Sequence, residues 1–381
     1  MTRCLRKFTP IVSLGTLVLI NACRKTDTPA NGNTGGGAST IAAPVTLDLI
    51  PAQNQTPGDR RIYLPIQKIG TSTLNLTTVF DSGSEGLVLS GTSVFAANYI
   101  ADTGIVINSP DSAVINGITV TSAKVTTTYG SPPATRSFYG NIAYAQLTIG
   151  DQSGTVLTTR MPFVVIYKGV DNQTQASVPV DANSDGVAGV YSSGFNPSAG
   201  LVTTRSGIKS PFNYFNYTNG LLAGFMLAPL SKIGWTGTAS SQGFPATPLL
   251  TLGLTLDMET GFALQSQRLD VGNLFDPDVL GTVSYNGITL NNSNILLDTG
   301  TPLGFMIYNS AEGGSTTLSG GAPVQLATRE GFSFAYTTDT QLSQTAVQSN
   351  GQQRCIFGIE FFLNNSFLFD YSEHYIGLKG S

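Results

Sequence analysis

The chain has 381 residues, of which 41% are hydrophobic and 11% are charged, and its formal net charge at pH 7 is −4. This apolar content and small net charge exclude an intrinsically disordered chain, and the scattered Lys and Arg residues form no basic stripe of the kind that binds nucleic acid. The single histidine, His374, excludes zinc peptidases with an HExxH motif, which need two histidines.

The first 22 residues have the composition of a secretory signal peptide. Three cations precede the apolar run 11–20, which is too short to span a bilayer. Residues 20–23, Ile-Asn-Ala-Cys, resemble the lipobox of bacterial lipoproteins, in which the cysteine becomes the lipidated first residue. This resemblance implies lipidation of Cys23 and a protein held at the bacterial cell envelope by that lipid alone, at the outer membrane facing the periplasm or the surface. The alternative is a signal peptide cut elsewhere, with Cys23 as a spare thiol.

A linker follows the signal peptide. Residues 26–40 are rich in Gly, Pro, Thr and Asn and contain almost no apolar side chain, which is typical of a flexible tether. We therefore assign residues 23–44 to this tether. Cys4 would leave with the signal peptide and Cys23 would carry lipid, so we expect Cys355 to have no intramolecular disulfide partner. Its apolar context predicts a buried thiol.

From Val45 onward the sequence predicts a body made of β-strands. Short runs rich in Val, Ile, Thr, Tyr and Phe alternate with Gly, Asn, Asp and Pro turn signals, and no long segment has a helical period. An all-β body of this length is large for one sandwich or barrel, so we predict two β-barrel-like lobes, 45–232 and 233–381, with a cleft between them. The expected strands include 62–66, 73–80, 124–129, 142–149, 163–167, 248–254, 288–297 and 361–369.

Two segments of the body repeat one pattern. Residues 77–84 and 294–301 each run an apolar strand into Asp-[Ser or Thr]-Gly-[Ser or Thr], with Asp81 and Asp298 at the turn. Glycine frees the turn for a backbone conformation that is closed to other residues, and the hydroxyls can hydrogen bond to the carboxylate and fix its orientation. One such motif is a common turn sequence, but the pair indicates a site with two carboxylates.

Two such loops that face each other would hold two carboxylates close enough to share a proton, because like charges at that range resist joint ionisation. The ionised group then acts as a general base on a water molecule, and the protonated group polarises a carbonyl. These properties predict hydrolysis with an acidic pH optimum.

With their flanking residues, the two motifs resemble the pepsin family of bilobal aspartic endopeptidases. Residues 69–71, Ile-Gly-Thr, resemble the strand that leads into the first family motif, and residues 185–189 are similar to the segment that packs behind the first catalytic loop. Residues 356–378 resemble the closing run of the second lobe. The likeness covers roughly residues 60–380, in family order.

The resemblance implies an aspartic endopeptidase that cleaves peptides or proteins as a monomer, with no cofactor and no metal. Asp81 and Asp298 would be its catalytic pair. Ser84 and Thr301 would hydrogen bond to the outer carboxylate oxygens.

Four further residues would support the catalytic pair in the same family arrangement. Ser82 and Thr299 would bridge the two loops, and Gly83 and Gly300 would form their turns.

The first lobe of the family also carries a β-hairpin flap with a Tyr-Gly pair near its tip, which contacts the substrate. Tyr129-Gly130 is the best match, and Tyr139-Gly140 is the alternative. Residues 131–136, which include two prolines, make a tip that is longer and stiffer than the usual one, so closure over a substrate is expected to differ.

Departures from the family pattern keep other functions open. The tryptophan common after the first motif is absent, Pro302 stands where serine is common, and Ile359 replaces an acidic residue. One alternative is a pepsin-like lipoprotein, weakly active or inactive, that binds a peptide or glycan in the cleft. Another is a structural surface lipoprotein. We expect Leu87, Tyr129 and Phe305 to line the cleft and to favour apolar side chains.

Overall fold

The computed structural model describes residues 37–53, 59–131, 134–151, 153–179, 183–191, 208–235, 242–269, 275–302, 304–340, 343–349 and 353–380. The predicted signal peptide, the predicted lipidation site Cys23 and most of the predicted tether lie outside the described residues. Within them, no helix is both long enough and apolar enough to cross a membrane.

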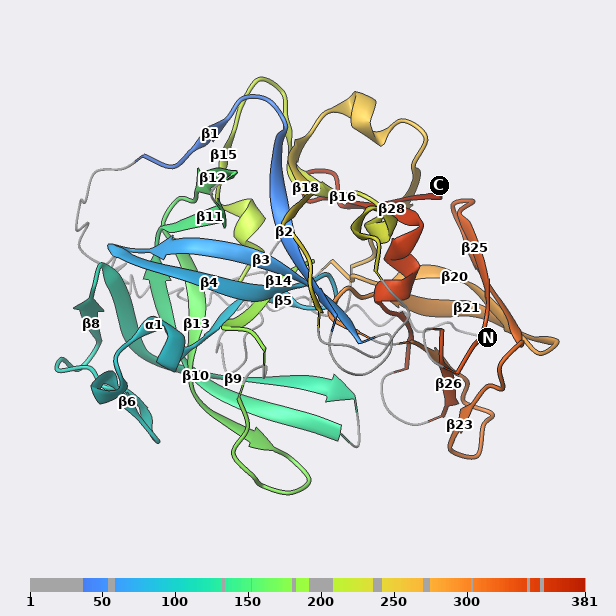
Figure 1. Ribbon diagram of the computed structural model, residues 1–381, viewed down its shortest axis with the longest axis horizontal. Coiled ribbons are helices and arrows are strands. Elements are labelled where there is room, and N and C mark those ends of the chain that lie inside the picture. The colour runs from blue at the N-terminus through green and yellow to red at the C-terminus, as the bar shows by residue number, and fades with distance from the viewer. Residues whose placement is uncertain are drawn as a thin grey trace, which may run out of the picture. The chain divides into compact units, whose positions relative to one another are not determined.

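The described body is built mainly of β-strands, so the predicted all-β class is confirmed (Figure 1). Two sheets are joined through β2 (Val45–Gln53), which pairs with β3 in one and β18 in the other. The first of these sheets also contains β3 (Arg60–Ile69), β4 (Ser72–Asp81), β5 (Glu85–Ser90), β8 (Ser112–Ile115), β9 (Ile118–Ser131), β10 (Ala134–Ala145), β11 (Leu147–Asp151), β12 (Gly154–Leu157), β13 (Met161–Asp171), β14 (Gly186–Val190) and β17 (Gln242–Gly243).

The second sheet takes its strands from distant parts of the chain. β28 pairs with β16 and with β29, and β18 pairs with β16 and with β2. This sheet contains strands from both predicted lobes, so it does not mark where one lobe ends and the other begins. The boundary between residues 232 and 233 therefore stays a prediction. Its further strands are β16 (Leu222–Leu227), β18 (Thr247–Leu254), β19 (Ala263–Ser266), β28 (Asn365–Asp370) and β29 (Tyr375–Gly380).

The third sheet has eight strands, in the order β23-β26-β22-β27-β21-β20-β24-β25. Cys355, at the start of β27, is a buried free thiol, as the sequence predicts. The strands are β20 (Val279–Tyr285), β21 (Ile288–Leu297), β22 (Phe305–Tyr308), β23 (Ser315–Thr317), β24 (Pro323–Thr328), β25 (Ser333–Thr337), β26 (Thr345–Gln348) and β27 (Cys355–Phe357).

The remaining described elements are short. Two-stranded pairs are formed by β1 (Thr40–Ile41) with β15 (Asn216–Tyr217), and by β6 (Ile100–Ala101) with β7 (Gly104–Ile105). The helices are α1 (Gly91–Val94) and the 3-10 turns η1 (Ala97–Tyr99), η3 (Pro211–Asn213), η4 (Leu230–Ile233), η5 (Leu256–Glu259) and η6 (Ile359–Leu363).

The expected strand over 361–369 is wrong in its first part. Residues Ile359–Leu363 form η6, and β28 begins at Asn365. The first four residues of η6 are all buried, and a short apolar run buried on every side has no periodicity that separates a strand from a helix. The expected strand over 142–149 is also divided, because Gln146 separates β10 from β11.

The same arrangement of three strands supports each aspartate motif. β4 ends at Asp81 and pairs in parallel with β14, which pairs antiparallel with β5. In the third sheet, β21 leads to Asp298 and pairs in parallel with β27, which pairs antiparallel with β22. Residues 186–189 therefore lie directly beside the end of the first motif strand, with Gly189 opposite Asp81.

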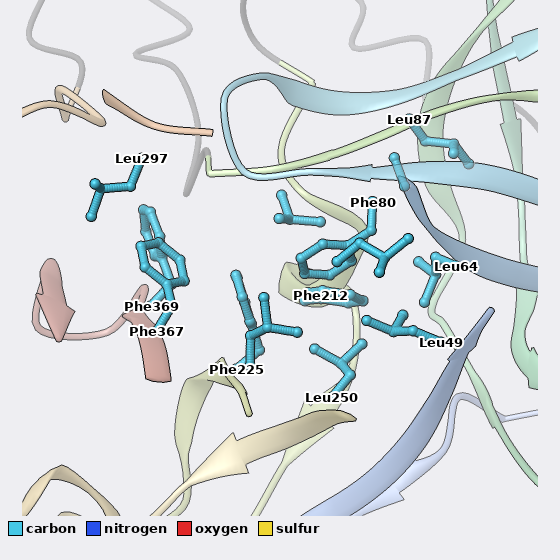
Figure 2. Close-up of a cluster of buried hydrophobic side chains, with 14 of the residues drawn as sticks. Leu49, Leu64, Phe80, Leu87, Phe212, Phe225, Leu250, Leu297, Phe367 and Phe369 are labelled. Atoms are coloured by element: carbon cyan, nitrogen blue, oxygen red, sulfur yellow. The ribbon is translucent and has the colours of Figure 1, made fainter. Parts of the chain in front are cut away.

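An apolar core anchors both motif strands (Figure 2). Phe80 precedes Asp81 and Leu297 precedes Asp298, and both apolar side chains are buried. The ring of Phe225 on β16 lies 5.6 Å from that of Phe80 and 6.0 Å from that of Phe369 on β28. Burying one such phenylalanine stabilises a fold by about 1.5–3 kcal/mol. The residues that precede the two aspartates are therefore held firmly.

Candidate active site

Each aspartate of the paired motifs is held by its own loop in the same way. Asp81 accepts a hydrogen bond from the Gly83 N–H at 2.8 Å and another from the Ser84 hydroxyl at 2.5 Å. Each bond goes to a different carboxylate oxygen, so the orientation of the carboxyl group is fixed at both atoms.

The second loop repeats these contacts around Asp298. The Gly300 N–H donates to one carboxylate oxygen at 2.7 Å, and the Thr301 hydroxyl donates to the other at 2.6 Å. The structure thus places Ser84 and Thr301 against the carboxylates, at the positions that the sequence predicts.

Four hydrogen bonds tie the two loops to each other through Ser82 and Thr299. Each of these residues donates its backbone N–H to the hydroxyl of the other, at 2.9 Å in both directions. The Ser82 hydroxyl also donates to the Leu297 carbonyl at 2.8 Å, and the Thr299 hydroxyl donates to the Phe80 carbonyl at 2.7 Å. Because both side chains are at most 2% exposed, water does not compete for these bonds. The two loops are therefore fixed relative to each other.

The glycines of the two motifs are required by close approach of the loops. A Cβ atom on Gly83 would lie 2.4 Å from a carboxylate oxygen of Asp298, and one on Gly300 would lie 2.5 Å from a carboxylate oxygen of Asp81. Neither glycine has a positive φ angle. The sequence-based explanation, an unusual backbone conformation, is therefore wrong, and the space between the loops is the physical reason.

For the peptide hydrolysis that the paired motifs predict, we expect Gly83→Ala to lower kcat/KM by more than about 100-fold. The added methyl group would displace the Asp298 carboxylate, and small misplacements in a catalytic site have effects of that size. Gly313→Ala is the matched control, since its added Cβ atom would meet nothing within 4 Å. Kinetics would be measured together with thermal unfolding. Full activity in a folded Gly83→Ala protein would show that the loops do not need this close contact.

The environment of Asp298 changes how this carboxyl group titrates. Burial and the neighbouring Asp81 carboxylate raise the pKa of Asp298, and the hydrogen bonds from Thr301 and Gly300 counteract part of that effect. Asp298 therefore keeps its proton at pH values where an ordinary aspartic acid is ionised. A carboxyl pair that holds one proton contains both a general acid and a general base.

A cavity of about 750 Å³ opens over the pair. Both aspartates line it, and so do Tyr129, Gly130 and Phe138. The last three residues belong to the hairpin of β9 and β10, whose course Figure 1 shows. The Tyr129 ring packs edge-on against Phe138, with 5.8 Å between ring centroids. The hairpin that carries Tyr129-Gly130 thus forms one wall of the cavity.

The alternative pair, Tyr139-Gly140, does not line the cavity. Gly140 pairs with Val125 and Ile166 inside the first sheet, where it has no room for a side chain.

The flap tip is shorter than the sequence suggests. Ser131 pairs with Ala134, so the two strands continue almost to the end of the hairpin. Only residues 132–133 separate them, and these lie outside the described residues. The expected long tip over 131–136 is therefore wrong, because strand pairing extends through most of it.

The expected apolar lining of the cavity is also wrong at two of three positions. Leu87 and Phe305 are buried in the core, with exposed fractions of 0% and 5%, and only Tyr129 faces the cavity. Leu87 lies on β5, between β13 and β14, and such interior strands bury side chains on both faces.

The lining of the cavity is mixed. Apolar side chains such as Val79, Phe138 and Ile356 contribute to it. The charged side chains that line it are Arg61, Glu85, Arg136, Asp171 and Arg354.

A buried ion pair behind the second loop was not found from the sequence. The Arg60 guanidinium donates to the Glu360 carboxylate at 2.7 Å, and both side chains are less than 10% exposed. The guanidinium also lies 5.1 Å from the centroid of the Trp235 ring. The Arg60 backbone N–H donates to the Pro302 carbonyl at 3.2 Å, which links the ion pair to the second loop. A single Glu inside the apolar run 355–363 is the sequence signal, since a buried charge needs a partner.

No protein-family model and no curated protein sequence matches this chain. Among solved structures, the fold is similar to the crystal structure of aspartic proteinase from Irpex lacteus, with a TM-score of 0.55 and 16% sequence identity. The match covers 89% of this chain and 98% of the other. The predicted pepsin-like fold is thereby confirmed, and at this identity the likeness concerns the fold alone.

Proposed function

We propose that this protein is an aspartic endopeptidase, which hydrolyses peptide bonds with a water molecule activated by Asp81 and Asp298. One observation carries the proposal: two carboxyl groups from equivalent loops, which hydrogen bonds between Ser82 and Thr299 tie together, line one cavity of about 750 Å³. The pepsin-like fold supports it.

The proposed reaction uses one shared proton. The Asp81 carboxylate takes a proton from a bound water molecule as its oxygen forms a bond to the carbonyl carbon of the peptide. Protonated Asp298 hydrogen bonds to the carbonyl oxygen and transfers its proton to it, which gives a neutral gem-diol. Asp81 then donates its proton to the leaving nitrogen, the C–N bond breaks, and one gem-diol hydroxyl returns its proton to Asp298. The products are a carboxylic acid and an amine, and the carboxyl pair is restored.

The protein's own residues favour these reaction steps in two ways. The bonds from Gly83, Ser84, Gly300 and Thr301 hold the carboxyl oxygens in place before the substrate binds, so little reorganisation is needed during the reaction. The hairpin with Tyr129 would cover the peptide and exclude bulk water.

The test is inhibition by a statine-type analogue, whose hydroxyl group imitates the gem-diol. A soluble protein of residues 41–381 is incubated with an unfolded protein substrate, with and without the analogue. We expect cleavage that the analogue blocks at a ratio near one inhibitor per protein. Binding of unfolded protein without any cleavage would contradict an enzymatic role and would favour the alternative, a lipoprotein that holds a peptide or glycan in its cleft.

We also propose that the protein is anchored to the bacterial cell envelope by lipid on Cys23. The signal peptide and the lipobox-like residues 20–23 support this proposal. Fractionation of cells that express the full chain tests it, because Cys23→Ala should move the protein from the membrane fraction to the soluble fraction. An unchanged membrane fraction would contradict lipid anchoring at this residue.

A further inference from the structure

Three guanidinium groups line the cavity, and two of them face a carboxylate of the protein. Arg354 lies 3.0 Å from Asp278, with which it forms an ion pair. Arg136 is the strand partner of Asp171 and, on its other side, of Tyr129. Its charge contributes to the lowered pKa of the Asp171 carboxyl group, after the larger effect of hydrogen bonds from Thr174.

Arg61 is the third guanidinium group, and it forms no ion pair with any described residue. It lies on β3, it is half-buried, and it donates one hydrogen bond through Nη1 to the carbonyl of Gly300 in the second motif. A guanidinium group has five N–H donors, so this single bond leaves most of them unused. Arg61 is therefore a cation in a cavity wall, next to the carboxyl pair, with spare donors.

Among the described residues, none of the acidic groups of the cavity forms an ion pair with Arg61. Asp171 is occupied by its own turn, where it accepts bonds from the N–H groups of Gln173 and Thr174. The carboxylate oxygens of Asp81 and Asp298 accept hydrogen bonds from their own loops. Glu85 also lines the cavity, on the side of the first motif at the start of β5. A partly desolvated guanidinium group gains most from a carboxylate that it can bind through two N–H groups.

We propose that Arg61 forms a subsite for an acidic side chain of the peptide substrate, close to the scissile bond. This inference rests on the proposed function, and it replaces the apolar preference that the sequence suggests with a preference for Asp or Glu at one substrate position. The carbonyl of Gly300 places Arg61 beside the second loop, so the selected residue is a near neighbour of the bond that is cut.

The test uses blocked peptides, acetylated at the N-terminus and amidated at the C-terminus, in which each position around the cleaved bond carries either Glu or Gln. A parallel set with a free C-terminus separates side-chain recognition from recognition of a terminal carboxylate. At pH 5.5 we expect one position at which kcat/KM for Glu exceeds that for Gln by about tenfold, since charge-assisted bonds are roughly twice as strong as neutral ones. At pH 3 the ratio should approach one, because the substrate Glu is then protonated.

Arg61→Gln should bring the Glu/Gln ratio at pH 5.5 close to one, and Arg61→Lys should retain part of it. The ratio separates specificity from structure, because loss of the bond to Gly300 would affect both peptides equally. Arg329→Gln, an exposed arginine that does not line the cavity, is the control and should leave the ratio unchanged. A ratio near one at every position in the wild-type protein, or an unchanged ratio in folded Arg61→Gln, would overturn the proposal.

Failure of the proposed function would give a different result. If no peptide of either set is cleaved, the dissociation constants of the Glu and Gln peptides are compared by calorimetry for the wild type and for Arg61→Gln. Tighter binding of the Glu peptide that depends on Arg61 would support the subsite in a protein that does not cleave peptides. Equal binding of the two peptides would contradict both the subsite and the proposed function.

Discussion

We expect Asp298→Asn to abolish the proposed cleavage and at the same time to make the fold more stable near neutral pH. The variant cannot supply or accept the shared proton, so we expect kcat to fall by at least about 10³-fold, within the range for loss of a general acid or base. Stability rises because asparagine removes a carboxyl group whose ionisation is disfavoured by burial and by Asp81.

The pH dependence of this stability gain follows from the direction of the pKa change. The pKa of Asp298 is raised in the folded state, so above the ordinary aspartate pKa the folded state binds more protons than the unfolded state. Wild-type stability therefore falls as the pH rises from the ordinary pKa through the raised one. We expect Asp298→Asn to raise Tm by roughly 2–5 °C at pH 7 and by less at pH 4.

Thermal unfolding at both pH values and a peptide cleavage assay check this prediction. Asp257→Asn, an exposed acid on η5, is the matched control and should change neither activity nor stability. Retained cleavage in Asp298→Asn, or equal Tm differences at pH 4 and pH 7, would contradict the role of the carboxyl pair.

Arg60→Ala is expected to cause the largest loss of stability. The variant leaves Glu360 buried without its cation. Removing one partner of a buried ion pair lowers the free energy of unfolding by about 3–5 kcal/mol. Burial raises the pKa of Glu360 to about 7 even with Arg60 present, and Arg60 counteracts the shift. Without Arg60 the pKa of Glu360 rises further, so Glu360 takes up a proton more readily. The stability that Arg60→Ala loses therefore becomes smaller as the pH falls.

Urea unfolding at pH 5 and pH 8 measures this effect. We expect Arg60→Ala to lower the free energy of unfolding by about 3 kcal/mol at pH 8 and by clearly less at pH 5. The double variant Arg60→Met with Glu360→Leu is the control, because replacing both charges with apolar groups is often neutral. If the single variant lost no more stability than the double variant at pH 8, Glu360 would not depend on Arg60.

The residues of the carboxyl site could be predicted from the sequence because their signal is local. In each motif, an apolar strand runs into Asp-Ser-Gly or Asp-Thr-Gly, and this pattern identifies the site residues and their order. Because the pattern occurs twice, it indicates that the two loops are equivalent. The contacts of Ser84 and Thr301 occur three residues from their aspartates, which is a distance that sequence spacing describes well.

Other features depend on contacts between distant residues, and the sequence could not reveal them. Arg60 and Glu360 are 300 residues apart, and no sequence pattern near either residue indicates that the other is its partner. The sequence predicts Leu87 and Phe305 in the cleft. Leu87 lies in a strand whose four central residues are all buried, and Phe305 lies on the buried face of β22, so both side chains are in the core. The apolar run that becomes η6 is buried on all sides, so it lacks the alternation that would have separated it from a strand.

The most direct test of the shared-proton mechanism is the rate of cleavage of an unfolded protein from pH 3 to pH 8, measured for residues 41–381 with Asp81→Asn alongside. The raised pKa of Asp298 predicts an acidic optimum, because at low pH both carboxyl groups become protonated and no base is left, and at high pH the acid is lost. We predict a rate that falls above mildly acidic pH and no cleavage by Asp81→Asn at any pH. A rate that keeps rising above neutrality, or cleavage by folded Asp81→Asn, would contradict the mechanism.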